Sequence, residues 1–455
     1  MPTVVLWFRR DLRVSDHPAL LAASATGADV LALFVVDPTL WHPGSVRTGR
    51  LLASLGALSG QLEGALVVRR GPPERVVAEV AEQVGAREVH VTRESTPYGR
   101  RRDDRVRTAL ASSGTQLVET GTPYAVGPGL LRNASGAAYQ VFTPFSRAWR
   151  DHGWPAPAPR PSAVAWHRGL TGERLARPTT ADAGESAALA AWGRFVEEGL
   201  DAYGRERDRP DLDTTSRMSV HLKYGEIHPR TMLADLAAHD AARPGPRAPE
   251  SGAHRYVTEL CWREFYADVL WHRPASAWQD LRDGLRTMPY ADASSPHVGA
   301  WQAGRTGYPF VDAGMRQLLE QGWMHNRARM VTASFLVKDL HVWWPVGARH
   351  FLAHLQDGDL ASNTHGWQWV AGTGTDAAPY FRIFNPVSQG LRFDPDGDYV
   401  RRWVPELAHL PGAAAHEPWR HPQGYAAGYP QRIVDHATER QESLRRYERA
   451  RSERP

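Results

Sequence analysis

The chain has 455 residues, 42% of them hydrophobic and 23% charged, which is the balance of a globular protein rather than of a disordered or fibrous one. Its formal net charge of +4 is too small to show an affinity for nucleic acid by itself. The single cysteine, Cys261, excludes an intrachain disulfide and a multi-cysteine zinc site, and we predict no metal site.

Five short β-rich runs open the chain and alternate with stretches of helical pattern. The runs are TVVLWF, VLALFVVD, ALVVRR, REVHVT and QLVE. Alternation of this kind predicts a parallel sheet with helices packed on it. We therefore predict an α/β domain with a Rossmann-like or flavodoxin-like parallel sheet over residues 1–130.

The rest of the chain has a different pattern. Pro, Ala, Gly and Ser dominate roughly residues 150–190 without a clear period, and we predict a long linker over residues 131–190. Later segments such as RYVTELCWREFYADVLWH and GWMHNRARMVTASFLVKDL have apolar residues at helical spacing, so we predict an all-α domain over residues 191–455. No apolar run reaches the roughly 20 residues of a membrane helix, and we expect a cytoplasmic protein without a membrane partner.

Two segments have patterns that suit the phosphates of a nucleotide. The turn GTGTDA, residues 372–377, matches the dinucleotide fingerprint G-x-G-x-x-A, but aromatic residues rather than a strand precede it and Pro379 follows it. In TTSRMSVHLKYGEIHPR, hydroxyl residues lie at the start of a predicted helix, where unpaired N–H groups favour an anion. These residues are Thr214, Thr215, Ser216 and Ser219. The alternative is ordinary helix capping by Thr215 or Ser216.

Two of the predicted helices align aromatic and polar side chains along one face. The first aligns Glu259, Trp262, Arg263 and Tyr266. The second aligns Trp323, Met330 and either Asn326 or Arg327. Residues three and four apart are neighbours on a helix, so each set lies along one face. The first face suits a planar ligand, and the second suits a stacked base. The alternative for both helices is a core stripe flanked by surface ion pairs.

Together these segments resemble the DNA photolyases of the photolyase/cryptochrome family. The resemblance covers nearly the whole chain. It rests on LWFRRDLRVSDHPAL, TTSRMSVHLKYGEIHPR, ELCWREFY, AWQAGRTGYPFVDAGMRQLLEQGWMHNRARMVTASFLVKDL and DGDLASNTHGWQWVAGTGTDAAPYFRIFNPVSQG. Within the family the chain is most similar to the class I branch, which acts on cyclobutane pyrimidine dimers. The resemblance implies an α/β antenna domain, a long linker and a helical domain that holds FAD in a bent conformation.

The activity implied by the resemblance is light-dependent DNA repair. Excited reduced FAD donates an electron to a flipped-out cyclobutane dimer, the ring bonds break, and the electron returns. Base flipping is a general property of enzymes that act on bases, a group that includes photolyases. The protein would act as a monomer on dimers in double- or single-stranded DNA.

The resemblance also implies roles for individual residues. The implied FAD contacts are Tyr203, Thr215, Ser216, Met218, Ser219, Arg263, Arg329, Asp357, Asp359 and Asn363. The implied lesion pocket comprises Glu259, Asn326, Met330 and the two stacking residues Trp262 and Trp369, with Arg207 and Arg327 at the flanking phosphates. The implied photoreduction relay is Trp367, Trp344 and Tyr290. Tyr290 matches the outer tryptophan of the family only with one inserted residue, so Trp301 and Trp343 are alternatives.

Asp37 and Arg50 resemble the antenna site of relatives that bind 8-hydroxy-5-deazaflavin, and we predict that chromophore. Methenyltetrahydrofolate or an empty antenna site are the alternatives. A blue-light-sensing cryptochrome without repair activity is the main alternative function. A (6-4) photolyase fits less well because Met330 stands where those enzymes place histidine, and a nicotinamide oxidoreductase comes last.

Overall fold

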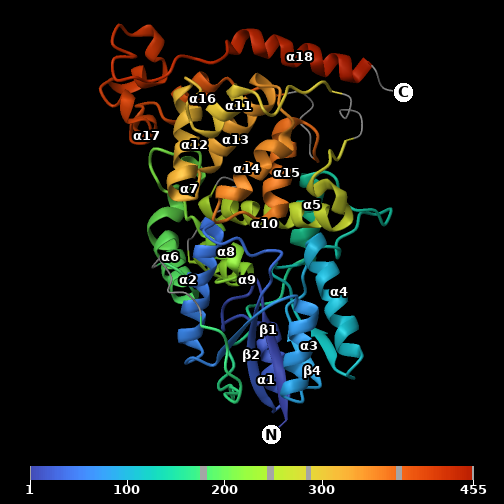
Figure 1. Cartoon of the computed structure of the whole chain (residues 1–455). Helices are drawn as coiled ribbons and strands as arrows, with labels where there is room; N and C mark the ends of the chain where they lie inside the picture. The colour runs from blue at the N-terminus through green and yellow to red at the C-terminus, as the bar shows by residue number, and fades with distance from the viewer. Residues whose placement is uncertain (1, 175–181, 243–250, 283–287, 376–381, 453–455) are drawn as a thin grey trace. The chain divides into compact units, whose positions relative to one another are not determined.

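The computed structural model describes residues 2–174, 182–242, 251–282, 288–375 and 382–452. The chain forms two compact units (Figure 1). Unit 1 comprises Met1–Tyr139, Thr143–Asp201 and Ser216–Pro274, and unit 2 comprises Gln140–Phe142, Ala202–Thr215 and Ala275–Pro455. The dinucleotide-like turn at 372–377 and the predicted linker at 131–190 both lie partly outside the described residues.

Unit 1 is built on a parallel sheet, for which the described residues supply five strands in the order β3-β2-β1-β4-β5. The strands are β1 (Thr3–Phe8), β2 (Asp29–Val36), β3 (Leu66–Arg70), β4 (Glu88–Val91) and β5 (Gln116–Glu119). Every neighbouring pair is parallel. Each of the five predicted β-rich runs forms one strand, which confirms the predicted α/β fold.

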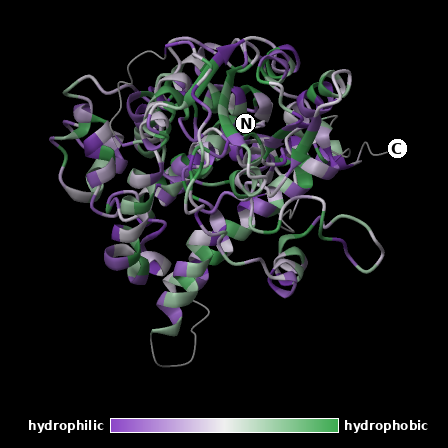
Figure 2. Ribbon diagram, turned by 90° about the horizontal axis from the view of Figure 1, so that it is seen from below, coloured by the Kyte–Doolittle hydropathy of each residue, from purple (hydrophilic) through white to green (hydrophobic). Residues whose placement is uncertain are grey.

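Both faces of this sheet are apolar and covered by helices. The helices are α1 (Pro18–Ala25), α2 (Val46–Gln61), α3 (Pro73–Gln83) and α4 (Pro97–Ala111). Phe8 belongs to the core shared with α1 and α2, whereas Trp7 belongs to the core shared with α3 and α4. Since neighbouring side chains of a strand point to opposite faces, a sheet buried on both sides needs an unbroken apolar run such as TVVLWF. The strands are accordingly mostly green in Figure 2.

The remaining elements of unit 1 are helical. They are α5 (Phe142–His152), α6 (Glu185–Arg194), the π-helical segment η1 (Phe195–Gly199), α8 (Met218–Tyr224), α9 (Pro229–Ala241) and α10 (Gly252–His272). The predicted linker range thus contains α5 and the start of α6. Part of it follows the sheet, since the N–H of His167 donates to the carbonyl of Val30 at 3.0 Å. The chain passes from unit 1 into unit 2 along α7 (Leu200–Glu206) and η2 (Pro274–Ala277).

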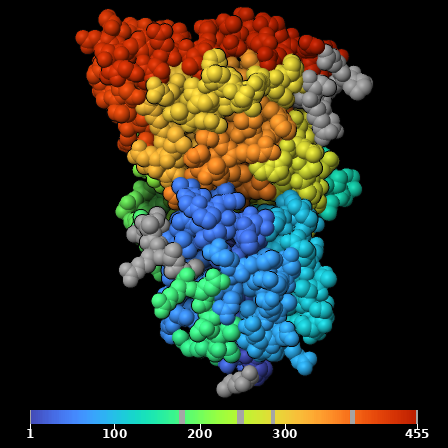
Figure 3. All heavy atoms as spheres, in the orientation of Figure 1, coloured from blue at the N-terminus to red at the C-terminus, as the bar shows by residue number. Residues whose placement is uncertain are grey.

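All regular elements described in unit 2 are helices, as the sequence predicts for this part of the chain. They are α11 (Pro296–Gln302), α12 (Pro309–Gln321), α13 (Asn326–Ser334), η4 (Phe335–Asp339), α14 (Trp344–His354), α15 (Leu360–Ala371), α16 (Pro386–Phe393), α17 (Asp398–Trp403), η5 (Pro405–Leu407), η6 (Gly412–His416), η7 (Pro418–Arg420) and α18 (His436–Ser452). Most of them share one core, which includes the buried rings of Trp301, Trp344 and Trp367, whereas Ala450 of α18 packs in a separate small cluster with Met288. The red C-terminal residues, with α18, lie at the surface of this unit in Figure 3. Among the described helices, none has both the length and the apolar character needed to cross a membrane.

Candidate functional site

The hydroxyl-rich segment before α8 is the first place where the sequence predicts a bound nucleotide. The helix begins at Met218, and its N-cap residue Arg217 has a left-handed backbone with a φ of 53° and provides no side-chain cap. Ser216 Oγ accepts the N–H of Met218 at 3.3 Å and shares a hydrogen bond of 2.7 Å with the hydroxyl of Tyr256. Ser216 therefore caps α8 in part, while Ser219 is exposed.

The two threonines of the same segment, Thr214 and Thr215, belong to unit 2. The side-chain oxygens of Thr214 and Thr215 are shielded from solvent and lack a hydrogen-bond partner among the described residues. A buried polar group left unpaired costs about 1–3 kcal/mol, which a ligand that pairs with it would recover. These two oxygens therefore fit a polar cofactor. Tyr203, the other predicted contact in this stretch, is half-buried, and the guanidinium of Arg207 lies 5.9 Å from the centre of its ring.

Arg329 of α13 and Asp357, in the turn between α14 and α15, form an ion pair. Arg329 Nη2 lies 2.8 Å from Asp357 Oδ2, and the side chain of Asp357 is 2% exposed. Arg329 Nε also donates to the carbonyl of Met324 at 2.7 Å, which fixes the guanidinium. The second oxygen of Asp357, Oδ1, is buried without a hydrogen-bond partner in the described parts of the chain. The structure thus brings two predicted cofactor residues together and leaves them one unsatisfied acceptor.

Two further predicted cofactor residues lie at the start of α15. Asp359 is the N-cap, and its Oδ1 accepts the N–H of Ser362 at 3.0 Å. Asn363 lies one turn later, and its Nδ2 donates to the carbonyl of Ala348 in α14 at 3.0 Å. Because that contact uses the amide nitrogen, the carbonyl oxygen of Asn363 is the group that remains for a ligand with an N–H donor.

The two tryptophans near the end of α15 have different surroundings. Trp367 is 3% exposed, and its ring fills the space beside Gly347 of α14, where an added Cβ would lie 2.1 Å from ring atom Cη2. Trp369 is half-buried, and the guanidinium of Arg382 lies 5.7 Å from its ring. Positions two apart on a helix point in different directions. One indole therefore lies in the helical core while the other remains accessible.

Further aromatic residues of the predicted relay lie within unit 2. Trp344 is fully buried, and its Nε1 donates to Oδ1 of the buried Asp280 at 2.6 Å. The ring of Trp343 lies 6.5 Å from that of Trp344 and 6.4 Å from that of Tyr290. Trp301, one of the alternatives to Tyr290, lies 6.1 Å from Trp367. The sequence did not single out Asp280, which no local pattern connects to Trp344.

In unit 1, α10 carries the residues predicted to contact a planar ligand. Trp262 is half-buried and packs 5.4 Å from Tyr266, as the helical spacing predicts. Glu259 is also half-buried. Arg263 instead turns inward, since its Nη1 donates to a carbonyl at 3.0 Å and its guanidinium lies 4.4 Å from the ring of Tyr124. These contacts show that Arg263 anchors the segment before α5 to α10.

The two arginines predicted at DNA phosphates share a carboxylate in unit 2. Asp208 Oδ2 lies 2.9 Å from Arg327 Nη2, and Asp208 Oδ1 lies 4.0 Å from Arg207 Nε. Arg327 also lies 4.1 Å from the ring of Phe393. The role of Asp208 was missed by the sequence analysis, although it directly follows Arg207. Its carboxylate offsets part of the positive charge of this surface.

The start of α13 holds the remaining predicted lesion residues. Burial is the main factor that lowers the pKa of His325 to about 4, so the neutral ring accepts the N–H of Arg327 at 3.1 Å and caps the helix. Asn326 is exposed, and its Nδ2 lies 3.7 Å from the sulfur of Met330. These two predicted lesion residues therefore lie side by side, one turn apart on α13.

The two predicted antenna residues are both engaged within unit 1. Asp37 accepts hydrogen bonds from the N–H of Thr39 at 2.9 Å and from the hydroxyl of Tyr98. Arg50 is 3% exposed and binds both carboxylate oxygens of Glu226 at 2.8 and 2.6 Å. Burial raises the pKa of Glu226, but hydrogen bonds, first from a histidine and then from Arg50, lower it to about 2. Arg50 is thus neutralised by a buried carboxylate far away in the sequence.

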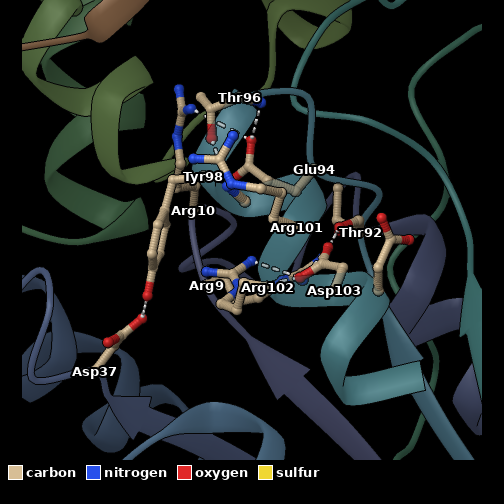
Figure 4. A network of polar contacts seen from close by, with 12 residues as sticks. Arg9, Arg10, Asp37, Thr92, Glu94, Thr96, Tyr98, Arg101, Arg102 and Asp103 are labelled. Atoms are coloured by element: carbon tan, nitrogen blue, oxygen red, sulfur yellow. Dashed lines mark hydrogen bonds and ion pairs between the residues drawn. The ribbon is translucent and has the colours of Figure 1, made fainter. Parts of the chain in front are cut away.

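A cluster of charged side chains lies at the carboxyl edge of the sheet (Figure 4). Arg9, directly after β1, binds both oxygens of Asp103 at 2.7 Å, and Arg102 donates to the same carboxylate at 2.8 Å. Both guanidiniums lie over the ring of Trp7, at 4.8 and 4.9 Å. Burial raises the pKa of nearby Glu94, but the neighbouring arginines lower it below its ordinary value. The sequence analysis missed this cluster, although an RRD motif follows the first strand.

Comparisons with known proteins agree with this architecture. Residues 4–162 match the family model of DNA photolyase, and residues 256–449 match that of the FAD binding domain of DNA photolyase. The deoxyribodipyrimidine photo-lyase of Streptomyces griseus is 41% identical, over 99% of each chain. This chain belongs to the photolyase/cryptochrome family. The deoxyribodipyrimidine photo-lyase of Escherichia coli strain K12 is 40% identical, again over 99% of each chain.

Solved structures of photolyases and of a cryptochrome have the same fold. A class III photolyase from Agrobacterium tumefaciens superposes with a TM-score of 0.91 at 36% identity, covering 99% of this chain and 98% of that one. A cryptochrome from Synechocystis gives 0.88 at 28% identity, with coverage of 98% and 99%. An archaeal photolyase from Sulfolobus tokodaii with two FAD molecules gives 0.84 at 27% identity, with coverage of 98% and 100%. The helical photolyase domain predicted from the sequence is therefore confirmed, whereas the class I branch is not.

Proposed function

We propose that this photolyase-family protein repairs cyclobutane pyrimidine dimers in DNA with light and FAD. The pair of tryptophans on α15 is the observation that carries the proposal. Trp367 lies in the helical core, where an indole suits electron donation to a buried cofactor, and Trp369 remains accessible, where an indole suits stacking on a base. Relatives named deoxyribodipyrimidine photo-lyase support the same activity.

The unsatisfied polar groups of unit 2 fit FAD as the cofactor. Bound FAD supplies the light absorption and the electron of the reaction. The hydroxyl of Thr215 and Oδ1 of Asp357 are buried without partners in the described structure, so each gains a hydrogen bond from a polar ligand. Arg329 holds Asp357 in place, and Asp359 fixes the start of α15. The other proposed contacts are Tyr203, Ser216, Met218 and Ser219.

Asn363 has a specific role in this proposal. Its amide nitrogen is used by the carbonyl of Ala348, so the side chain presents an oxygen to the ligand. An oxygen acceptor matches the N5–H group of a reduced flavin and not the unprotonated N5 of an oxidised one. Asn363 thereby favours the reduced cofactor, which is the electron donor in repair. Arg263 stays a predicted contact, although its hydrogen bonds to backbone carbonyls and its ring contact lie within unit 1.

The lesion residues supply stacking and hydrogen bonds rather than a nucleophile. Trp262 and Trp369 stack on the extruded dimer, an interaction worth about 1–3 kcal/mol per base. Glu259 and Asn326 hydrogen-bond the pyrimidine edges, with the amide of Asn326 as the donor where negative charge develops during bond cleavage, and Met330 packs against the rings. Such groups act by preorganised electrostatics in a water-poor pocket.

Arg207 and Arg327 bind the phosphates on either side of the lesion. Phosphate contacts of this kind position DNA without reading its sequence. Repair of one class of lesion in any sequence context needs this type of binding. We propose the same mode for single- and double-stranded DNA.

The antenna chromophore is a separate proposal, for which 8-hydroxy-5-deazaflavin remains our choice. Both oxygens of Glu226 contact the guanidinium of Arg50 and neutralise its charge. A chromophore that contacts Arg50 would therefore have to bind beside this ion pair without breaking it. Methenyltetrahydrofolate, a second flavin or an empty site are the alternatives. The class I branch, a monomeric state and a cytoplasmic location likewise stay predictions.

Two variants test the proposed roles against each other. Glu259→Ala is expected to lower the yield of repaired dimers per absorbed photon more than it weakens DNA binding. Arg327→Ala is expected to weaken binding to all DNA sequences and to flatten its salt dependence. Equal losses of yield and affinity in both variants would contradict these roles. A wild-type protein that binds FAD but removes no dimers under light would instead favour the cryptochrome alternative.

A further inference from the structure

Asp280 and Trp344 form a short hydrogen bond between two buried side chains of unit 2. Asp280 Oδ1 lies 2.6 Å from Trp344 Nε1. Trp344 is 0% exposed and Asp280 is 6% exposed, so water does not compete for the indole N–H. A hydrogen bond to a carboxylate is about twice as strong as one between neutral groups. The structure therefore holds a base directly on the proton that an indole loses when it is oxidised.

The other indoles near Trp367 have no such base. Trp301, at 6.1 Å from Trp367, donates its N–H to the backbone carbonyl of Thr332 at 3.0 Å, and a carbonyl does not take up a proton at neutral pH. Trp367 itself has a buried Nε1 without a hydrogen-bond partner in the described parts of the chain. An indole radical cation is far more acidic at this nitrogen than the neutral indole. Of these tryptophans, Trp344 alone has an acceptor for the proton.

Tyr290, the predicted outer member of the relay, is poorly suited to hold the oxidised state. Its ring lies 6.4 Å from Trp343, within reach of electron transfer. Its hydroxyl is buried, however, and has no hydrogen-bond partner among the described residues. Burial raises the pKa of Tyr290, and the charge of Asp280 adds to that effect. A phenol gives up an electron readily only when its proton leaves as well. Tyr290 lacks an acceptor for that proton among the described residues, whereas Trp344 has one, so Tyr290 is harder to oxidise.

We propose that Asp280 is the proton acceptor that holds the oxidised site of the photoreduction relay on Trp344. This inference rests on the proposed function, in which Trp367 donates an electron to the bound cofactor. FAD bound in its oxidised form would supply, under light, the one-electron oxidant of Trp367. One electron passes from Trp344 to the oxidised Trp367, the Nε1–H bond of Trp344 breaks, and an O–H bond forms on Asp280. The products are a neutral indole radical, a neutral carboxylic acid and a restored Trp367.

Asp280 also selects the route of the electron. Trp301 and Trp344 both lie in the core that contains Trp367, but of these two only Trp344 donates a hydrogen bond to Asp280, so the negative charge of Asp280 stabilises a positive charge most on Trp344. Proton transfer then removes that charge and slows the return of the electron. The oxidised site thus remains inside the protein instead of moving to an exposed side chain.

The test uses Asp280→Asn, which keeps an oxygen acceptor for the indole N–H but cannot take up its proton. The FAD-loaded protein is oxidised, flashed with light and followed by transient absorption, which distinguishes neutral tryptophan, cationic tryptophan and tyrosyl radicals. In the wild type we expect a neutral tryptophan radical that Tyr290→Phe does not alter and Trp344→Phe abolishes. In Asp280→Asn we expect a cationic radical whose lifetime is at least about tenfold shorter, which corresponds to about 1.4 kcal/mol in the barrier.

A tyrosyl radical in the wild type that disappears in Tyr290→Phe would overturn the proposal. A neutral radical of unchanged lifetime in Asp280→Asn would overturn it as well. An independent reading comes from the FAD-free protein labelled with ¹⁵N-tryptophan. The indole N–H signal of Trp344 is identified as the one that Trp344→Phe removes. In the wild type it is expected far downfield, and in Asp280→Asn it is expected to move upfield. A signal that Asp280→Asn does not move would contradict the charged hydrogen bond.

Failure of the proposed function would look different. Repair by wild-type protein whose flavin has been reduced chemically does not use the relay. Absence of that repair, with the radical and N–H signals as expected, would count against dimer repair and leave the role of Asp280 intact. Normal repair with the opposite radical behaviour would refute the role of Asp280 alone.

Discussion

Removal of the carboxylate between the two proposed phosphate-binding arginines is predicted to tighten DNA binding. Asp208 lies 2.9 Å from the guanidinium of Arg327 and 4.0 Å from that of Arg207. In the free protein it neutralises part of the charge that a phosphate would meet. Asp208→Asn keeps the size of the side chain and removes only the charge.

The expected gain follows from the exposure of the pair. The side chains of Arg327 and Asp208 are 15% and 32% exposed, so the pair is more shielded than a surface ion pair. Exposed pairs contribute about 0.2–1 kcal/mol, and the upper end of that range applies here. A change of about 1 kcal/mol lowers the Kd for DNA about fivefold. The slope of log K against log salt is expected to steepen by up to about 0.9, the value for one additional phosphate neutralised.

The assay is fluorescence anisotropy with one duplex, with and without a thymine dimer, at several salt concentrations. Asp398→Asn is the matched control, because it removes the same charge from an exposed pair with Arg401 elsewhere in unit 2. The control is expected to change the Kd by less than about twofold. Equal tightening in both variants would show that only the net charge of the protein matters and not the position of Asp208. Weaker DNA binding by Asp208→Asn would refute the reasoning.

Three stability predictions accompany this one. Glu226→Gln is expected to lower the free energy of unfolding at neutral pH by about 3 kcal/mol, because the pKa of Glu226 is about 2 and thus below the ordinary 4.5. The wild type has this stability above pH 4.5 and loses it as the pH falls towards 2. Denaturation of both proteins at several pH values checks the size and the pH dependence of the effect. Gly347→Ala is expected to cost about 1–3 kcal/mol by overpacking and to change the fluorescence of Trp367, whereas Gly366→Ala, with no atom within 4 Å of the new Cβ, is its neutral control in denaturant titrations. Glu264→Gln is expected to cost about 1.5–3 kcal/mol, because its carboxylate accepts three backbone N–H groups and one indole N–H, and faster amide exchange at residues 125–127 would report the loss. Unchanged exchange at those amides would contradict this stabilising role of Glu264.

The central strands of the sheet, β1 and β2, were predictable from local sequence because they are buried on both faces, whereas the edge strand β5 is only partly buried. An unbroken apolar run such as that of β1 satisfies both neighbouring cores, with Trp7 in one and Phe8 in the other. The direction of the strands followed from the alternating helices. Helix starts were less predictable. α8 begins at Met218 rather than at the threonines, because Arg217 adopts a left-handed backbone that no sequence pattern marked.

The residues that complete the candidate site come from distant parts of the chain. Arg50 and Glu226 are separated by 176 positions, and Trp344 and Asp280 by 64. Their contacts depend on how distant elements pack and not on local spacing, so the sequence could not predict that these residues form pairs. The resemblance to photolyases supplied the proposed roles of the site residues. The structure added the carboxylates Asp208 and Asp280, which adjust the charge around those residues.

The central claim is that this protein uses light and reduced flavin to split pyrimidine dimers. The most direct measurement is the number of dimers left in a defined oligonucleotide after anaerobic illumination with the FAD-loaded, chemically reduced protein. We predict that dimers convert to intact pyrimidines in proportion to the light absorbed, with no conversion in the dark. Protein that binds both flavin and the oligonucleotide, yet leaves the dimers unchanged under light, would contradict the account.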